Sequence, residues 1–257
     1  MIKKHFIERV VSQEEIAENT YLMKLTCAQE AIRIFRAGQF MHIEIPHARE
    51  LLLRRPISIN YVDVKRKEVH IVYNAIGKGT RLLTLCRPGD MLDILMPLGN
   101  GFTLPEDAKK IWLIGGGVGI APLKSVRCNY PDKEYSAFLG YRNADCVYQA
   151  QDFEKFAKTY VTTDDGSFGT KGFCTQVLAD RLKSEMPDMI LACGPTPFFR
   201  SLAKAVGDVP TLVSLEQRMG CGTGGCAVCA CSIRGEYKKV CLNGPVFPIK
   251  EVDALYD

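Results

Sequence analysis

The 257-residue sequence lacks any apolar run that approaches the roughly 20 consecutive residues a membrane-spanning helix needs. It also lacks an apolar stretch after Lys3 and Lys4, so no secretory signal peptide is expected. Its basic residues are dispersed, with no block longer than Lys65-Arg66-Lys67, and the net charge of +4 leaves no footprint for nucleic acid. These absences argue against a membrane protein and a nucleic-acid-binding protein, and they predict a cytoplasmic location.

The composition is that of a folded chain. Hydrophobic residues make up 47% of the sequence and charged residues 24%, which excludes a disordered protein. At roughly 100 to 200 residues per domain, the length predicts about two domains. The pattern of predicted strands and helices and the residue composition change twice along the sequence. We expect domain boundaries at these points, giving segments 1–102, 103–213 and 214–257.

Segment 1–102 contains short alternating or β-branched runs separated by turn-forming residues. Strands at this spacing predict an antiparallel barrel or sandwich. We expect strands over 21–26, 40–45, 57–61, 69–73 and 91–95, and one or two helical turns over 80–85.

Segment 103–213 alternates apolar strands with helical stretches, which predicts a parallel, doubly wound α/β sheet. Segment 214–257 is rich in Gly and Cys and has little core of its own. In segment 103–213 we expect strands over 110–114, 135–139, 160–163 and 189–193, and helices over 122–126, 151–156, 175–178 and 197–202.

Cysteine use is unusual. There are eleven cysteines, and four of them fall within eleven residues: Cys221, Cys226, Cys229 and Cys231. In a chain without a secretory signal a disulfide framework is disfavoured, so a dense group predicts metal ligands. The scattered cysteines, apart from Cys241, are expected to be small buried hydrophobic residues.

The spacing Cys221-x4-Cys226-x2-Cys229, with Cys241 after eleven more residues, matches that of plant-type 2Fe-2S ligands. Glycines around these cysteines permit tight curvature and leave amides free to bond sulfur. Structural zinc and a redox thiol pair are the alternatives; a Rieske centre or Cys2His2 finger would need nearby histidine. Cys231 fits the pattern less well and is expected to be a packed thiol.

A glycine-rich loop lies between a predicted strand and a predicted helix, where backbone amides can face a phosphate. It lacks both the Gly-Lys-Ser/Thr ending of a nucleoside-triphosphate loop and the third glycine of the usual dinucleotide fingerprint. A tight turn for helix packing is therefore the alternative. A Cys-Gly-Pro turn ends a later strand, where a parallel sheet opens toward ligand. The candidate residues of the two turns are Gly115, Gly116, Gly117, Gly119, Pro122, Cys193, Gly194 and Pro195.

A third motif combines Arg54-Arg55-Pro56-Ile57-Ser58 with Gly77-Lys78-Gly79-Thr80. The planar arginine fork suits a pyrophosphate, a serine can donate to a ring nitrogen or oxygen, and a glycine heading a helix can hold a phosphate. Taken singly, the arginines would be a solvated surface pair. Followed by the dinucleotide-like segment, the combination predicts a nucleotide cofactor.

The order of these motifs resembles the ferredoxin reductase superfamily. The segments 216–229 and 240–247 are also similar to those of the electron-transfer subunits of type B, NAD-dependent dihydroorotate dehydrogenases. The resemblance covers almost the whole chain. It implies an antiparallel β-barrel that binds FAD, an α/β domain that binds NAD, and a small C-terminal domain with a 2Fe-2S cluster.

The resemblance also implies roles for individual residues. Many superfamily members have an aromatic residue where Ile57 stands. NAD would meet the two turns over 115–122 and 193–195. The flavin ring would be lined by Arg55, Pro56, Ile57 and Ser58, its ribityl and adenine side by Val72, Tyr73 and Asn74, and its diphosphate by Gly79 and Thr80. The cluster ligands would be Cys221, Cys226, Cys229 and Cys241.

The family further implies an FMN-containing partner subunit that oxidises dihydroorotate to orotate in pyrimidine biosynthesis, within a heterotetramer. Electrons would pass through the cluster and FAD to NAD, because a flavin converts between hydride and the single electrons a cluster carries. None of the four histidines suggests a catalytic residue here. Two alternatives stay open: a flavin and iron-sulfur subunit of a cytosolic hydrogenase or transhydrogenase, and a zinc-stabilised redox-sensing or interaction module.

Overall fold

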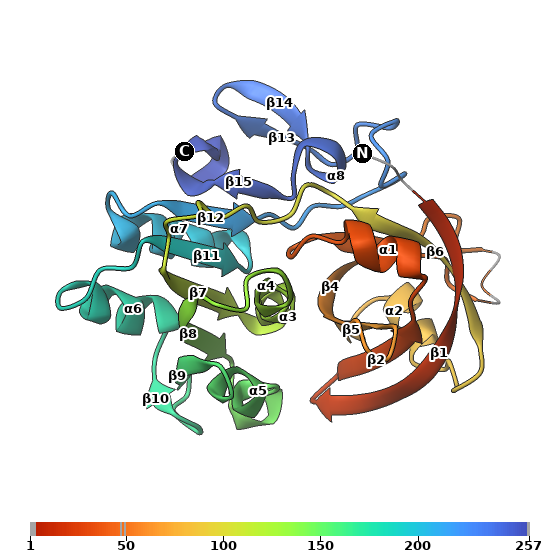
Figure 1. Cartoon of the computed structure of the whole chain (residues 1–257), viewed down its shortest axis with the longest axis horizontal. Coiled ribbons are helices and arrows are strands. Elements are labelled where there is room, and N and C mark those ends of the chain that lie inside the picture. The colour runs from red at the N-terminus through yellow and green to blue at the C-terminus, as the bar shows by residue number, and fades with distance from the viewer. Residues whose placement is uncertain (1–3, 47, 49, 256–257) are drawn as a thin grey trace.

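The computed structural model describes residues 4–46, 48 and 50–255. Figure 1 shows a barrel beside an α/β layer structure, with the C-terminal segment lying across one edge of both. The barrel is closed and antiparallel, in the strand order β1-β2-β5-β4-β3-β6. Its elements are β1 (Lys4–Ala17), β2 (Thr20–Thr26), α1 (Gln29–Ile34), β3 (Phe40–Ile43), β4 (Arg55–Asp63), β5 (Glu68–Asn74), α2 (Lys78–Leu83) and β6 (Met91–Leu98).

The predicted strands of this segment correspond to β2 to β6, and the structure closes them into a barrel rather than a sandwich. The first strand, β1, was not predicted. Near its start, the usual alternation of buried apolar and exposed polar side chains is reversed. Ile7 is exposed, whereas the neighbouring Glu8 is buried and accepts hydrogen bonds from Thr26 Oγ1 and the Ala28 amide. Because this buried position carries a glutamate, the sequence does not show the apolar and polar alternation that indicates a strand.

The second sheet has seven strands in the order β10-β9-β8-β7-β11-β12-β15. All its neighbours are parallel except β12 and β15, which are antiparallel. The strands and helices of this part are β7 (Lys110–Gly116), η1 (Gly117–Gly119), α3 (Ile120–Lys124), α4 (Val126–Asn129), β8 (Glu134–Tyr141), η2 (Ala144–Cys146), α5 (Ala150–Glu154), β9 (Ala157–Thr163), β10 (Thr170–Lys171), α6 (Cys174–Leu182), β11 (Met189–Cys193), α7 (Thr196–Val206) and β12 (Thr211–Ser214).

Helices cover both faces of this sheet, which confirms the doubly wound prediction (Figure 1). Successive residues of β7 point to opposite faces. Trp112 packs with Leu178 of α6 and Phe199 of α7 in one apolar cluster, whereas Leu113 packs with Leu123 of α3 in the other.

The C-terminal segment contributes the outermost strand of this sheet. Val213 and Ser214 of β12 lie opposite Phe247 and Val246 of β15. Most of its buried residues join the cluster of Trp112, and Val246 joins that of Leu113, which fits the expectation that the segment has little core of its own. The elements of the segment are β13 (Ala230–Ile233), β14 (Glu236–Lys239), α8 (Val240–Asn243), β15 (Val246–Pro248), η3 (Ile249–Glu251) and η4 (Asp253–Leu255).

Hydrogen bonds fix the barrel against its neighbours. The Asn60 and Gln149 side-chain amides bond each other in both directions, at 2.9 and 3.1 Å, across the boundary between barrel and α/β sheet. Asn100, after the last barrel strand, donates to the carbonyl oxygens of Asn243 and Val246. In the described part of the chain, no helix has the length and apolar content that crossing a bilayer requires.

Because β15 is packed into the shared core, we predict that Phe247→Ala destabilises the whole fold by about 3 to 5 kcal/mol. Phe247 is buried, so its removal leaves a cavity. Urea denaturation measures the effect. Tyr237→Ala is the matched control, since Tyr237 belongs to the same segment and is 85% exposed, and this variant should unfold like the unmodified protein. Equal stability of the two variants would contradict the structural role assigned to β15.

Candidate functional site

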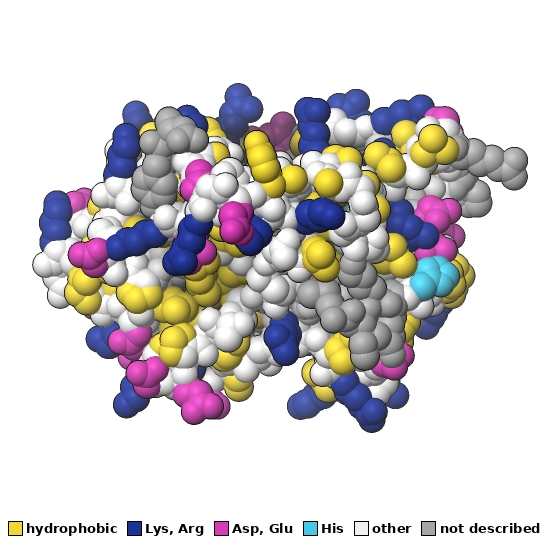
Figure 2. All heavy atoms as spheres, turned by 90° about the horizontal axis from the view of Figure 1, so that it is seen from above, with side chains coloured by type: hydrophobic (Ala, Val, Ile, Leu, Met, Phe, Trp, Pro, Cys, Tyr) yellow, Lys and Arg dark blue, Asp and Glu magenta, His cyan; other side chains and the backbone are white. Residues whose placement is uncertain are grey.

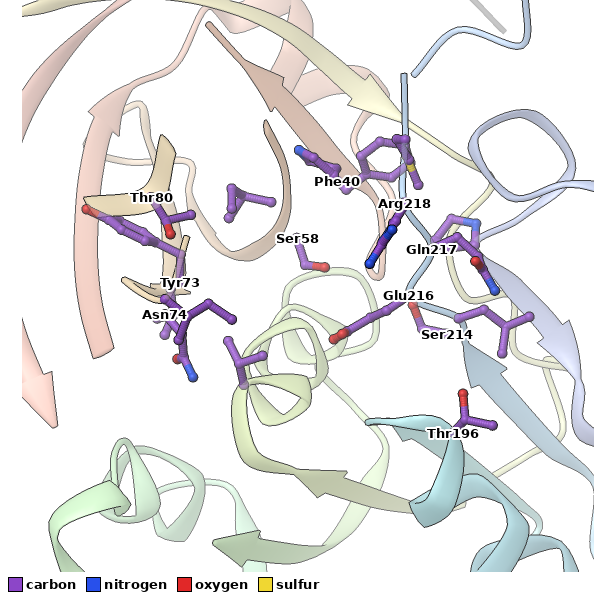
Figure 3. A pocket seen from close by; sticks show the side chains of 18 residues that line it. Phe40, Ser58, Tyr73, Asn74, Thr80, Thr196, Ser214, Glu216, Gln217 and Arg218 are labelled. Atoms are coloured by element: carbon purple, nitrogen blue, oxygen red, sulfur yellow. The ribbon is translucent and has the colours of Figure 1, made fainter. Parts of the chain in front are cut away.

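A cavity of about 560 Å³ lies between the barrel and the α/β sheet, a size typical of ligand pockets. Figure 3 shows its interior. The barrel, the loop after β7 and the segment after β12 all contribute to it. Its lining residues are Phe40, Pro56, Ile57, Ser58, Val72, Tyr73, Asn74, Ile76, Thr80, Val118, Thr196, Ser214, Leu215, Glu216, Gln217, Arg218, Met219 and Pro245.

The barrel wall of this first cavity is formed by β4, β5 and the start of β3. Ser58 pairs with Phe40 across the ladder, so both side chains lie on the same face. On β5, the side chains alternate, and Tyr73 turns into the barrel. Its ring is buried and its hydroxyl donates to Gln13 Oε1 at 2.8 Å, so the aromatic ring points away from the cavity (Figure 3).

The two arginines of the third motif separate. Arg54 forms ion pairs with Asp93, at 2.6 Å, and Glu44, at 2.8 Å, which turns it away from the cavity. Arg55 instead lies against the first turn of α2: a Cβ added at Gly79 would be 2.4 Å from its Nε. Of the pair, only Arg55 is therefore placed beside the predicted phosphate-binding turn.

The opposite wall is formed by residues 214–219, which no sequence motif marks as part of a site. Figure 3 shows Ser58, Glu216 and Arg218 converging on the middle of the cavity. The Glu216 side chain is exposed where the two cavities meet, and desolvation by the surrounding protein raises the pKa of its carboxyl. The available signal was positional, since residues after a parallel strand lie at the ligand-binding edge of the sheet, but the strand β12 was itself not predicted.

A second cavity, of about 500 Å³, lies at the carboxyl ends of β7, β8, β9 and β11. Since β8 and β11 flank β7, this is the point where the strand order reverses, the usual ligand site of an open α/β sheet. Val118 and Glu216 line both cavities, so the two meet there. The second cavity is lined by Gly116, Gly117, Val118, Gly140, Tyr141, Arg142, Asp164, Phe173, Cys174, Thr175, Pro195, Pro197, Phe198, Ser201 and Glu216.

Only part of the glycine loop faces the second cavity. Gly116 and Gly117 line it, and a Cβ at Gly117 would meet no atom within 4 Å. A Cβ at Gly115 would instead lie 2.7 Å from Ile120, and one at Gly119 would lie 2.5 Å from the Cys193 carbonyl oxygen. The packing role that the sequence left open therefore applies to Gly115 and Gly119.

The remaining predicted contacts lie around this loop. Pro122 is buried within α3 and does not line either cavity. In the Cys-Gly-Pro turn, Cys193 is buried and lines neither cavity, and burial raises the pKa of its thiol. Gly194 packs against Phe198, while Pro195 reaches the cavity wall.

The four predicted cluster cysteines form two pairs. The amide of Cys221 donates to Cys226 Sγ at 3.3 Å, and the amide of Cys241, in α8, donates to Cys229 Sγ at 3.4 Å. Cys221 Sγ in turn accepts hydrogen bonds from the amides of Thr223, Gly225 and Cys226, at 3.2 to 3.4 Å.

Burial raises the pKa of the Cys221 thiol, but hydrogen bonds from Thr223 and Cys226 outweigh it and lower the value to about 5. Burial and the neighbouring sulfur of Cys229 raise the pKa of Cys241 to about 12. N–H groups directed at sulfur suit thiolate ligands whose charge is shared with metal.

Within the described residues, no three His, Cys, Asp or Glu side chains are gathered so that they could hold one metal ion. Two pairs of cysteines are the donor set that a two-iron cluster requires, with two thiolates for each iron. The arrangement therefore fits a 2Fe-2S cluster better than a single zinc ion. Cys231, on β13, packs against the core, and burial together with the charge of Cys229 raises its pKa to about 11.

The cysteine loop lies at the surface. Cys226 is exposed, and the apolar side chains of Val228 and Leu242, which are 57% and 41% exposed, flank the loop. Figure 2 looks onto the face that carries the C-terminal segment, where hydrophobic side chains lie among lysines and arginines. A partner molecule can therefore approach the loop directly.

Comparison with known families matches two parts of this architecture. Residues 216–253 match the family described as the iron-sulfur cluster binding domain of dihydroorotate dehydrogenase B. Residues 113–204 match the oxidoreductase NAD-binding domain. The first match contains all four paired cysteines, and the second contains the glycine loop and the Cys-Gly-Pro turn.

Whole-chain comparisons agree. The solved structure of NADH-dependent reduced ferredoxin-NADP oxidoreductase has a TM-score of 0.84 at 31% identity, over 97% of this chain and 91% of that one. A ferredoxin NADP+ reductase from Neisseria gonorrhoeae, solved with bound FAD and NADP, shares the fold at a TM-score of 0.67 and 16% identity, over 80% and 92%. The dihydroorotate dehydrogenase B (NAD(+)) electron transfer subunit of Geobacillus kaustophilus is 42% identical over 252 residues, which cover 95% of this chain and 96% of that subunit. The chain therefore belongs to the family of dihydroorotate dehydrogenase B electron transfer subunits.

Proposed function

We propose that this chain passes electrons from an FMN-containing, dihydroorotate-oxidising partner chain through a 2Fe-2S cluster and FAD to NAD, in pyrimidine biosynthesis. The observation that carries the proposal is the continuity of the three sites. The segment 214–219 leads from the wall of the first cavity directly into the cysteine loop, and the two cavities meet at Val118 and Glu216. The chain therefore offers one short route from a surface cysteine loop to a nucleotide cavity.

The first cavity fits FAD, which supplies the conversion between single electrons and hydride. Ile57 and Val72 offer an apolar wall to a ring, and Ser58 offers a hydroxyl donor. Arg55 provides its planar fork beside Gly79 for a diphosphate. From the resemblance, the remaining contacts are Pro56, Asn74 and Thr80, together with Tyr73, which lines the cavity although its ring points into the barrel.

The second cavity fits NAD as a diffusible substrate. Gly116 and Gly117 present backbone without side chains, so a dinucleotide can approach closely. Pro195 and Phe198 form an apolar wall on the other side. Because the cavities meet at Glu216, a nicotinamide ring placed there would be within reach of a flavin ring, and the protein would serve to align the two and exclude water.

We propose Cys221, Cys226, Cys229 and Cys241 as the cluster ligands, and the exposed face beside Cys226 as the one that meets the partner. The domains are then 1–102 for FAD, 103–213 for NAD and 214–257 for the cluster. We place the protein in the cytoplasm, within a heterotetramer, where its eleven cysteines, all free in the structure, stay reduced. Family membership argues against the hydrogenase, transhydrogenase and zinc-module alternatives.

The proposed function assigns NADH oxidation to this chain and dihydroorotate oxidation to the partner chain. The purified chain alone should oxidise NADH with an artificial acceptor but leave dihydroorotate unchanged. Mixed with the FMN-containing partner, it should support dihydroorotate-dependent reduction of NAD, measured by absorbance. A colourless protein without iron or flavin, or dihydroorotate oxidation by the chain alone, would contradict the proposal.

Cys226→Ser should abolish the cluster and retain FAD, because Cys226 is an exposed ligand that does not line the flavin cavity. Dihydroorotate-dependent NAD reduction should be lost, while NADH oxidation by an artificial two-electron acceptor persists. Cys231→Ser is the matched control and should keep its iron. Iron and flavin analyses of both purified variants test this; equal loss of iron from Cys231→Ser would overturn the ligand assignment.

Gly79→Ala should weaken FAD binding by about tenfold, since a displaced contact of about 1.4 kcal/mol changes affinity by that factor. The new methyl group would push aside the Arg55 guanidinium, whose flexible side chain can move without unfolding the barrel. Gly77→Ala is the control, because its Cβ would meet only Thr80 Oγ1, at 3.9 Å. The dissociation constant of FAD is measured for each variant by fluorescence titration of the flavin-free protein. Matching values for both variants would exclude Arg55 from flavin binding.

A further inference from the structure

His42 occupies an unusual place on the barrel. It lies on β3 between Met41 and Ile43, which are buried in the barrel core. Because side chains alternate along a strand, His42 points to the opposite face. There it neighbours Phe40, a lining residue of the first cavity, at a ring separation of 6.1 Å, and lies opposite Pro56, another lining residue.

The cysteine loop covers the outer face of this imidazole. Gly222, directly after Cys221, has a positive φ of 66°. A Cβ built on it would be only 2.7 Å from Nδ1 and 2.8 Å from Cε1 of His42. Glycine is thus required at position 222 on two counts, and the imidazole packs directly against the backbone beside a proposed cluster ligand.

His42 is completely buried, and neither of its ring nitrogens has a hydrogen-bond partner among the described residues. An imidazole keeps at least one N–H donor in every protonation state. A buried donor without an acceptor costs about 1 to 3 kcal/mol. Such a group is retained where the complete protein supplies its partner, and the loop above it is the one proposed to hold the cluster.

Within the part of the chain that the structure describes, the hydrogen bonds that Cys221 Sγ accepts all come from the loop, and none comes from the barrel side. The amides bonded to Cys221 Sγ come from Thr223, Gly225 and Cys226, all within the loop itself. The His42 ring approaches from the barrel and is the unpartnered donor on that side of Gly222 among the described residues.

We propose that His42 is a positioning residue for the 2Fe-2S cluster, donating its imidazole N–H to a cluster sulfur from the barrel side. The inference rests on the proposed function, which places a cluster in this loop. A hydrogen bond to sulfur stabilises the more negative, reduced state and raises the reduction potential. The flavin-binding barrel would thereby adjust the potential of the cluster that exchanges electrons with it.

A spectroscopic experiment tests the contact in the unmodified holoprotein. The chain has four histidines, so labelling with 15N-histidine marks few sites. In the dithionite-reduced protein, pulsed electron paramagnetic resonance should detect coupling between the cluster spin and a histidine 15N nucleus. The coupling should persist in His70→Gln, a matched control whose histidine pairs with Glu68 on β5, and disappear in His42→Gln. A reduced cluster signal without histidine coupling would overturn this inference alone, whereas a protein without iron would overturn the proposed function.

The reduction potential provides a second, independent readout. His42→Phe removes the donor and should lower the ratio of reduced to oxidised cluster at a fixed potential by about tenfold, which is a negative shift of about 59 mV for one electron. His42→Asn and His42→Gln place an amide N–H near the positions of Nδ1 and Nε2, so one of them should restore the potential. A purely packing role predicts no such rescue. An unchanged potential in His42→Phe, with full iron content, would contradict the proposal.

Discussion

The antiparallel pairing of β15 with β12 is the constraint on which the rest of the structure depends. The buried side chains of residues 214–255 join those of the α/β sheet instead of forming a separate cluster. Asn100 ties the same segment to the end of the last barrel strand. The cysteine loop is thereby held directly after residues 214–219, which line the first cavity, as a relay between cofactors requires.

This arrangement explains why a short chain can serve three carriers. The barrel and the sheet each contribute one wall to the first cavity, and the segment after β12 contributes the third. Glu216 and Val118 belong to both cavities, so a hydride donor and its acceptor can be brought face to face. The cysteine loop, in contrast, is exposed at Cys226, where a partner can exchange electrons without entering the cavities. In the proposed relay, hydride would therefore pass within the cavities, and single electrons would pass at the protein surface.

Much of this could be predicted from local patterns. The alternation around Met41 marked a barrel strand, the buried run over 110–114 marked the first parallel strand, and the cysteine spacing marked the cluster. Predictions failed where residues act across long separations. Glu8 concealed β1 because its buried carboxyl accepts hydrogen bonds from groups that only the fold brings to it, and β15 is too short to signal its place at the sheet edge. Arg218 and Glu216 became site residues only because β12 directs the chain into the cavity.

The most direct test of the relay is an anaerobic titration of the purified holoprotein with NADH, followed by absorbance and by electron paramagnetic resonance. A flavin accepts two electrons and a 2Fe-2S cluster one, so three electrons in total, or about 1.5 equivalents of NADH, should complete the reduction. Flavin bleaching together with the signal of a reduced cluster is the expected result. Saturation at one equivalent, with bleached flavin and a cluster that stays oxidised throughout, would contradict it.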